Sequence, residues 1–193
     1  MLLLSDIVSA QYDYNDDNKA YCEILSLYPK ELTDHLPKLN QDELVHEEFE
    51  FPRGKYSSFI HMIYSYTDKK RAVVEKEIQA KAKKIYHFTD SCLMVINDKW
   101  NPKDSTLFSS DTCVALAPDA LPIPNFNLLK KLGAIPEVYE NAVIYVLDAE
   151  KGSFLEDIFL SVDGVGLPKG WEHGYTKGAL ISGNLVFYWL EVW

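Results

Sequence analysis

The most regular alternation of apolar and polar positions in this chain lies in its middle and has a helical period. From Lys69 to about His87 there is no glycine or proline, and most residues are good helix formers. The apolar side chains recur at spacings that place them on one stripe: Val74, Ile78, Ala82 and Ile85. The pattern predicts a long helix that begins at Thr67-Asp68 and packs one face against the rest of the fold.

Shorter patterns precede this helix. Residues 18–28 predict a helix with one apolar face, followed by Pro29. Residues 29–42 contain two prolines and predict a helical turn and then a loop. The alternation that ends the stretch 43–51 predicts a strand. The aromatic and β-branched residues of 56–66 favour another strand, and a helix stays open there.

Beyond residue 90 the pattern changes to short apolar runs that are typical of strands. These runs are residues 92–96, 113–116, 141–147 and 158–162. A polar loop is predicted over 97–111, and the proline-rich stretch 118–127 is predicted to wrap the surface. Residues 128–132 end at Gly133, as a helix with a glycine cap does.

The end of the chain carries the strongest strand signal. Residues 177–181 and 185–193 flank Ser182-Gly183-Asn184, which favours the tight turn of a β-hairpin. Even-numbered positions of the last run are apolar, and the odd-numbered positions are apolar except for Glu191.

Helices thus gather in the N-terminal part and strands in the C-terminal part. Segregation of this kind predicts the α+β class rather than alternating α/β. We expect a helix-rich N-terminal part packed on a mainly antiparallel C-terminal sheet that ends in a hairpin. No flexible linker marks the change, so residues 1–193 are predicted to form a single domain, with at most a sub-boundary near residue 90.

Charge is unevenly spread along these 193 residues, whose net charge is −10. Residues 1–50 hold twelve acidic and three basic residues, 53–84 hold three acidic and nine basic, and 85–193 hold fourteen acidic and seven basic. An acidic protein repels phosphate backbones and attracts basic partners. We therefore expect the partner to be a protein with a basic surface. We expect no nucleic acid, because Glu75 and Glu77 dilute the basic segment and the rest of the chain is acidic.

The three cysteines are widely spaced and form no Cys-x-x-Cys pair, which excludes a zinc knuckle. We expect buried free thiols, as in reducing compartments. The start, Met1-Leu2-Leu3-Leu4, has no basic region before it and stops at Ser5-Asp6, unlike a signal peptide. No run approaches the ~20 apolar residues of a membrane span. These features predict a cytoplasmic protein with no membrane partner.

Motifs of known chemistry are missing. In the glycine-rich stretch 164–170 the third glycine comes one position too late for a dinucleotide fingerprint, and Pro168 removes an amide. The five histidines are never spaced as metal-ligand pairs, and no nucleophile elbow is present. We therefore predict no catalytic, cofactor-binding or metal-binding residue, and no cofactor.

One short segment keeps an enzymatic alternative open. Tyr86-His87-Phe88-Thr89-Asp90 resembles the first-strand segment of some ADP-ribosyltransferases, in which a histidine holds the ribose of the nicotinamide dinucleotide. The resemblance implies that role for His87, with Glu137, Glu140 or Glu150 as the later glutamate. The other interpretation is a helix end whose C-terminal dipole favours the charge of His87. The sequence favours a protein that is not an enzyme, and leaves the question open.

The acidic composition, the α+β pattern and the missing catalytic motifs together resemble bacterial toxin-immunity proteins, which neutralise a toxin made by the same cell. The resemblance implies a protein-binding module that inhibits a cognate toxin by direct binding. Its predicted partner-binding residues are acidic or aromatic: Tyr12, Asp13, Tyr14, Asp16, Asp17, Glu47, Glu48, Glu50, Trp171 and Tyr175.

Overall fold

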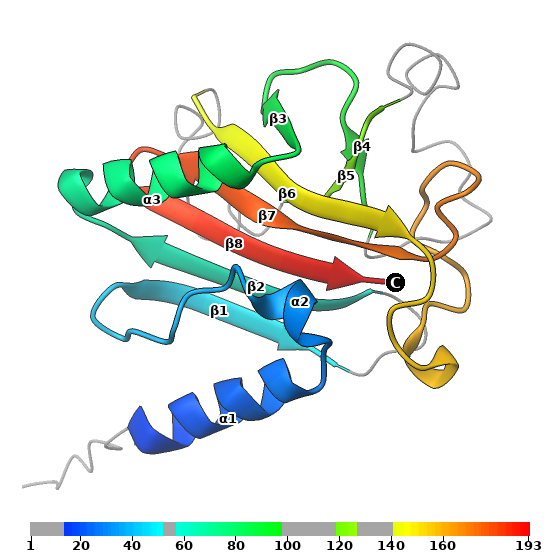
Figure 1. The fold of residues 1–193 in the computed structure, drawn as a ribbon, viewed down its shortest axis with the longest axis horizontal. Coiled ribbons are helices and arrows are strands. Elements are labelled where there is room, and N and C mark those ends of the chain that lie inside the picture. The colour runs from blue at the N-terminus through cyan, green and yellow to red at the C-terminus, as the bar shows by residue number, and fades with distance from the viewer. Residues whose placement is uncertain (1–13, 52–56, 98–118, 127–140) are drawn as a thin grey trace, which may run out of the picture.

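A six-stranded antiparallel sheet forms the centre of the protein in a computed structural model that describes residues 14–51, 57–97, 119–126 and 141–193 (Figure 1). The strand order is β1-β2-β8-β7-β6-β3. The sheet strands are β1 (Leu44–Glu50), β2 (Ser58–Ser65), β3 (Lys84–His87), β6 (Val143–Lys151), β7 (Gly174–Ser182) and β8 (Leu185–Val192). The helices are α1 (Tyr14–Ser26), α2 (Lys30–Thr33), α3 (Asp68–Lys81) and the 3-10 helix η1 (Asp157–Phe159). The short strands β4 (Met94–Val95) and β5 (Pro122–Ile123) pair separately and in parallel.

The predicted helix-rich N-terminal part is wrong. Strands make up 36% of the structure and helices 22%. Three of the six sheet strands, β1, β2 and β3, come before residue 90. The aromatic and β-branched side chains of β2 are buried on both faces because β2 pairs with β8 near the middle of the sheet. Residues before and after position 90 therefore share one sheet.

The predicted long helix also ends earlier than expected. Thr67 caps α3 by accepting a hydrogen bond from the backbone N–H of Lys70, and the chain turns extended at Ala82, with φ −66° and ψ 126°. Residues Lys84–His87 then pair with β6 as strand β3. Helix propensity is a weak preference, and the hydrogen bonds offered by the sheet edge overcome it here.

Three further predictions need correction. The 158–162 strand is absent: η1 occupies part of it, with Ile158 71% and Val162 82% exposed. The proline-rich stretch does not wrap the surface, because Ile123 and Phe126 belong to the core. The cysteines are not all buried free thiols: Cys22 is free but exposed, and Cys92 is disulfide-bonded. The prediction failed because spacing along the chain does not show which sulfur atoms lie close together in the fold. Residues 113–116 and 128–132 lie outside the described residues.

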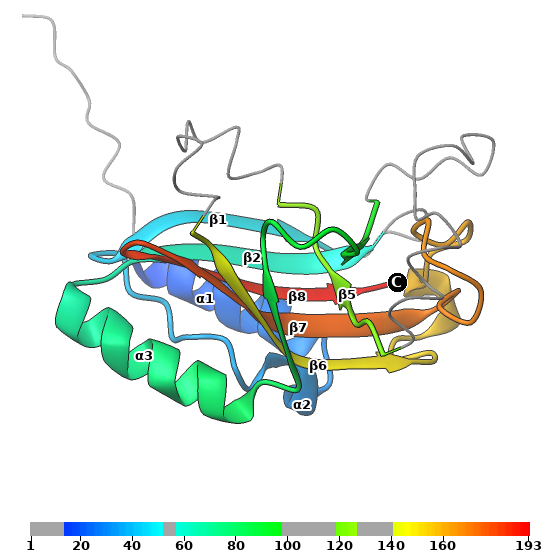
Figure 2. The ribbon, with the colours of Figure 1, turned by 90° about the horizontal axis from the view of Figure 1, so that it is seen from above.

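The C-terminal hairpin is confirmed. Ser182 lies opposite Leu185, and Gly183 adopts the left-handed conformation that the turn requires, with φ 55°. Alternate residues of β8 serve two cores, Tyr188 in one and Phe187 and Trp189 in the other. Figure 2 shows α1, α2 and α3 on one side of the sheet, against the core that contains Tyr188. Within the described residues, no helix is long and apolar enough to cross a membrane.

Candidate functional site

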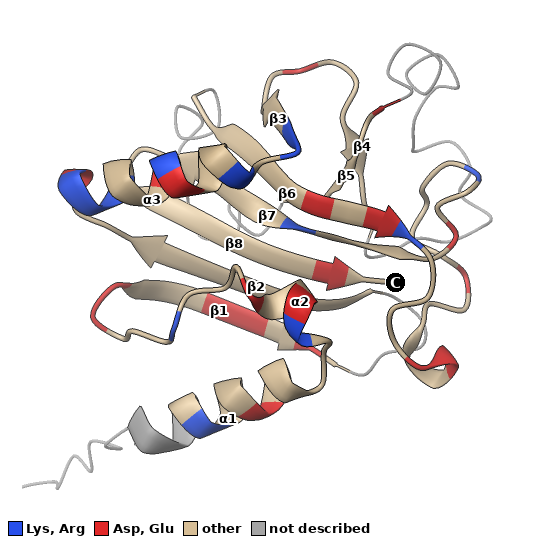
Figure 3. Cartoon of the chain, viewed as in Figure 1, with Lys and Arg blue, Asp and Glu red and all other residues tan. Residues whose placement is uncertain are grey.

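Two features are candidates for a functional site: an acidic face built by α1 and α2, and a cavity beneath α3. Tyr21 of α1 stacks on Phe49 of β1, with 5.9 Å between ring centroids, and α2 follows α1 directly. Exposed carboxylates lie on both helices, Glu23 on α1 and Glu31 on α2, and Figure 3 shows acidic positions on both. Glu48 of β1 is also exposed, but it points to the opposite face of the sheet from its neighbour Phe49, and therefore away from α1.

The structure brings together only some of the predicted partner-binding residues. Glu48 is exposed, whereas Glu47 and Glu50 are half-buried. Tyr14, Asp16 and Asp17 belong to α1, whose first residues have no described side chains, and Tyr12 and Asp13 lie outside the described residues. Trp171 and Tyr175 are only 7% and 4% exposed, because their rings pack in the two cores. These two aromatic residues therefore offer no surface for a partner.

Three residues of the basic segment form ion pairs within the fold. Lys70 Nζ lies 2.5 Å from Glu43 Oε2, Lys83 Nζ lies 2.5 Å from Asp148 Oδ1, and Arg71 pairs with Glu75 one turn along α3. Lys177 of β7 also forms an ion pair, with its Nζ 2.8 Å from Asp34 Oδ1. These contacts pair basic side chains with acidic groups of the same chain. Lys69, Lys76 and Lys81 of α3 are exposed, and among the described residues none of the three has an ion-pair partner. On α1, the carboxylate of Glu23 lies 3.8 Å from the ammonium of Lys19.

His87 lies at the end of β3 with its side chain exposed. Its backbone N–H donates to Asp90 Oδ2 at 2.8 Å, which closes a turn after the strand. His87 does not line the three cavities considered below. The role of His87 as an ADP-ribosyltransferase histidine stays a prediction.

The largest of these cavities, about 430 Å³ in volume, lies between α3, the segment after α2 and the sheet. Its apolar and aromatic lining comes from Leu39, Tyr64, Tyr66, Val74, Ile78, Leu147 and Tyr188. Its polar lining comes from Asp34, His35, Lys38, Asn40, Glu43, Lys70, Glu77 and Lys81. Among the described residues, no cluster of three side chains able to hold a metal ion is present here or elsewhere.

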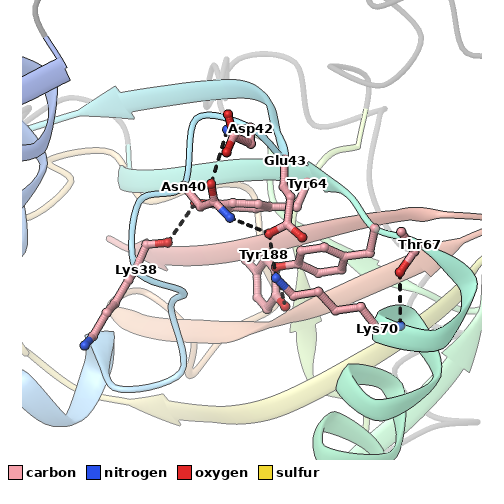
Figure 4. Close-up of polar contacts among 9 residues, drawn as sticks. Lys38, Asn40, Asp42, Glu43, Tyr64, Thr67, Lys70 and Tyr188 are labelled. Carbon is pink, nitrogen blue, oxygen red and sulfur yellow. Dashed lines mark hydrogen bonds and ion pairs between the residues drawn. The ribbon is translucent and has the colours of Figure 1, made fainter.

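A polar network closes one side of the cavity (Figure 4). Glu43 Oε2 accepts from Lys70 Nζ at 2.5 Å and from Asn40 Nδ2 at 2.7 Å. The Lys70 ammonium also lies 4.6 Å from the centre of the Tyr66 ring, within the range of a cation–π contact. Lys70 is therefore held from two sides and ties the start of α3 to the loop before β1.

Three tyrosine hydroxyls lie around the cavity. Tyr64 Oη donates to the carbonyl of Lys38 at 3.3 Å, and the hydroxyls of Tyr66 and Tyr188 are 3.5 Å apart. Burial raises the pKa of Tyr64, Tyr66 and Tyr188, so all three stay protonated at neutral pH. Sequence analysis missed this group. A partial signal existed, since Tyr64 and Tyr66 are two residues apart and such residues share one face of a strand.

His35, beside the cavity, is held as a neutral ring. Its Nε2–H donates to the backbone carbonyl of Trp189, 2.8 Å away, which can only accept. Burial, with a further contribution from the nearby Lys177 charge, lowers the pKa of the imidazole to about 4. The hydrogen bond fixes the loop after α2 to the middle of β8.

We expect the chain to lose stability as the pH falls from 6.5 to 4, by about 3 kcal/mol from His35 alone. Across this window the unfolded chain binds a proton at this ring and the folded chain does not, so acidification favours unfolding. His35→Asn keeps a donor for the Trp189 carbonyl and removes the titration. Urea unfolding at several pH values measures the effect, and the same acid slope in both proteins would contradict it.

A buried pair on the opposite face of the sheet also escaped sequence analysis. His61 Nε2 of β2 lies 2.9 Å from Glu191 Oε1 of β8, and the two side chains are 10% and 4% exposed. The His61 ring stacks on Phe59, with centroids 4.4 Å apart, and lies 5.1 Å from Phe187. The other oxygen, Glu191 Oε2, is buried and has no hydrogen-bond partner among the described residues. This pair lines none of the described cavities and belongs to the core.

Comparison of the chain with protein-family models, curated proteins and solved structures finds no match.

Proposed function

We propose that the chain is an acidic protein-binding module that neutralises a cognate toxin by direct binding, as the immunity proteins that it resembles do. The observation that supports this proposal is the pair of exposed carboxylates on α1 and α2 in a chain whose net charge is −10. Glu23 and Glu31 face outward there (Figure 3), while Lys70, Arg71 and Lys83 pair with acidic groups of the same chain. A surface of this kind speeds the encounter with a basic partner and disfavours other partners.

The proposed partner is a protein with a basic surface, and the proposal includes no nucleic acid, membrane or cofactor. The helices α1 and α2 would form the contact, through the exposed Glu23 and Glu31. The cytoplasm is the proposed compartment, although a disulfide such as the one at Cys92 is uncommon in a reducing cytosol.

Reversing two charges of the acidic face tests the proposal. We expect Glu23→Lys with Glu31→Lys to weaken binding of a basic partner about tenfold or more, because both carboxylates are exposed on consecutive helices. The partner is first captured from the source cell and identified by mass spectrometry. Calorimetry with the purified partner then measures affinity as the salt concentration is raised, which should weaken binding further.

The matched control reverses two exposed carboxylates outside α1 and α2, Asp119→Lys with Asp163→Lys, and changes the net charge equally. We expect this control to change affinity only slightly. Equal losses in the two double variants would mean that net charge, and not this face, governs binding. Binding that is insensitive to salt would contradict the proposal outright.

A further inference from the structure

The cavity beneath α3 combines an aromatic floor with a rim that carries both signs of charge. Tyr66, Tyr188 and Ile78 are each at most 7% exposed and line its inner part. Glu77 and Lys81 are exposed and line its outer part. A cavity of about 430 Å³ lies in the size range of small-ligand sites, which are mostly apolar and contain a few convergent polar groups.

Three charged residues that line the cavity have no ion-pair partner among the described residues: Lys38, Glu77 and Lys81. Figure 4 shows the Lys38 ammonium pointing away from the other labelled side chains, so Glu77 and Lys81 are the two charges considered for a ligand. Of the carboxylates that line the cavity, Glu43 is paired with Lys70 and Asp34 with Lys177. Glu77 and Lys81 lie one turn apart on α3, and among the described residues neither has an ion-pair partner. Opposite charges at this spacing commonly pair with each other. Here an ammonium and a carboxylate line the same cavity and leave each other free.

The floor also offers a hydrogen-bond donor. The hydroxyls of Tyr66 and Tyr188 carry two protons, and the 3.5 Å contact between the two oxygens uses one of them. The second O–H can donate to an acceptor that enters the cavity. Both hydroxyls remain protonated at neutral pH because burial raises the pKa of each.

We propose that this cavity binds a small zwitterionic aromatic molecule, such as a free aromatic amino acid. Its ring would lie against the tyrosine and isoleucine floor, its ammonium would face Glu77 and its carboxylate would face Lys81. A ligand with one charge would leave one of these rim groups without a partner, so the balance of charge selects a zwitterion. The acidic face takes no part in this site, and the inference stands independently of the proposed function.

Three indole compounds with different charges test the inference: tryptophan carries both charges, tryptamine only the ammonium and indole-3-acetate only the carboxylate. In calorimetric titrations we expect tryptophan to bind about fivefold or more tightly than either of the others. Glu77→Gln should weaken tryptophan about fivefold and leave indole-3-acetate unchanged. Lys81→Gln should weaken tryptophan equally and leave tryptamine unchanged.

Glu77 and Lys81 lie on the exposed side of α3, so their replacement by glutamine does not put folding at risk. Lys76→Gln on the same helix is the matched control, because Lys76 does not line the cavity. The control should bind all three compounds as the unaltered chain does. Tyr188→Phe removes the floor hydroxyl and should weaken tryptophan. The inference is overturned if no compound binds at millimolar concentration, if all three bind equally, or if Glu77→Gln and Lys81→Gln behave like Lys76→Gln.

Discussion

Replacing Gly178 with alanine should lower the free energy of unfolding by about 4 kcal/mol, among the largest losses expected from adding one methyl group. A Cβ atom at this position would lie 2.2 Å from the carbonyl oxygen of Tyr145 and 2.5 Å from the Trp189 ring. The first neighbour is backbone of the adjacent strand β6, and the second is a fully buried indole directly opposite in β8. Neither can turn away as an exposed side chain would.

Urea unfolding followed by circular dichroism measures this loss. Gly183→Ala is the control, because Gly183 has φ +55° but no atom within 4 Å of an added Cβ, so it tests backbone strain alone. We expect it to cost about 1 kcal/mol. Adding Trp189→Phe to Gly178→Ala should recover part of the loss, since a smaller ring leaves room for the methyl group. A Gly178→Ala protein as stable as the Gly183→Ala protein would contradict this account of the sheet.

The crowding at Gly178 shows what the sequence could and could not predict. The hairpin was predictable because Ser182-Gly183-Asn184 is a local turn signal between two apolar runs. The glycine requirement at 178 was not, because it depends on Trp189 lying opposite it across the hairpin and on Tyr145 in another strand. Local patterns fix turns and buried faces, whereas close approaches depend on strand order.

The helix predicted over residues 84–87 was wrong for a related reason. Its residues continue the apolar stripe of α3, and nothing in the segment itself marks a change of structure at Ala82. The hydrogen bonds that make Lys84–His87 a strand come from Val143–Val146, about sixty residues later in the chain. Residues 43–51 and 56–66 were predicted to be strands, so the helix-rich description of the N-terminal part failed at β3 and at the pairing of β2 with β8, which joins the two parts of the chain in one sheet.

The candidate sites follow the same rule. The negative character of residues 1–50 is a property of composition, so the sequence predicted an acidic surface; of the acidic residues named in β1, Glu48 is exposed and Glu47 and Glu50 are half-buried. The cavity could not be predicted, because Tyr66 and Tyr188 are 122 residues apart and meet only through the pairing of β2 with β8. Trp171 and Tyr175 were named as partner-binding residues, although aromatic strands are more often core, because an aromatic cluster has the same sequence pattern whether it is buried or exposed.

Glu191→Ala should also lower the free energy of unfolding by about 4 kcal/mol, because it breaks a buried pair and leaves the His61 ring without its partner. The matched control is Lys83→Met, which breaks a pair with a 2.5 Å separation whose lysine side chain is 53% exposed. Surface pairs of this kind contribute under about 1 kcal/mol, since water and salt screen them. Urea unfolding of both variants gives the comparison.

A double variant separates the pair itself from the cost of leaving one partner behind. His61→Phe with Glu191→Leu replaces both polar groups by apolar ones beside Phe59 and Phe187, and it removes the buried Glu191 oxygen that has no hydrogen-bond partner among the described residues. We expect the double variant to be about as stable as the unaltered chain, or more stable, because desolvation offsets much of the attraction within a buried pair. If the double variant were as unstable as Glu191→Ala, the pair would itself be a main source of stability. If Glu191→Ala cost no more than Lys83→Met, burial would add nothing to the interaction.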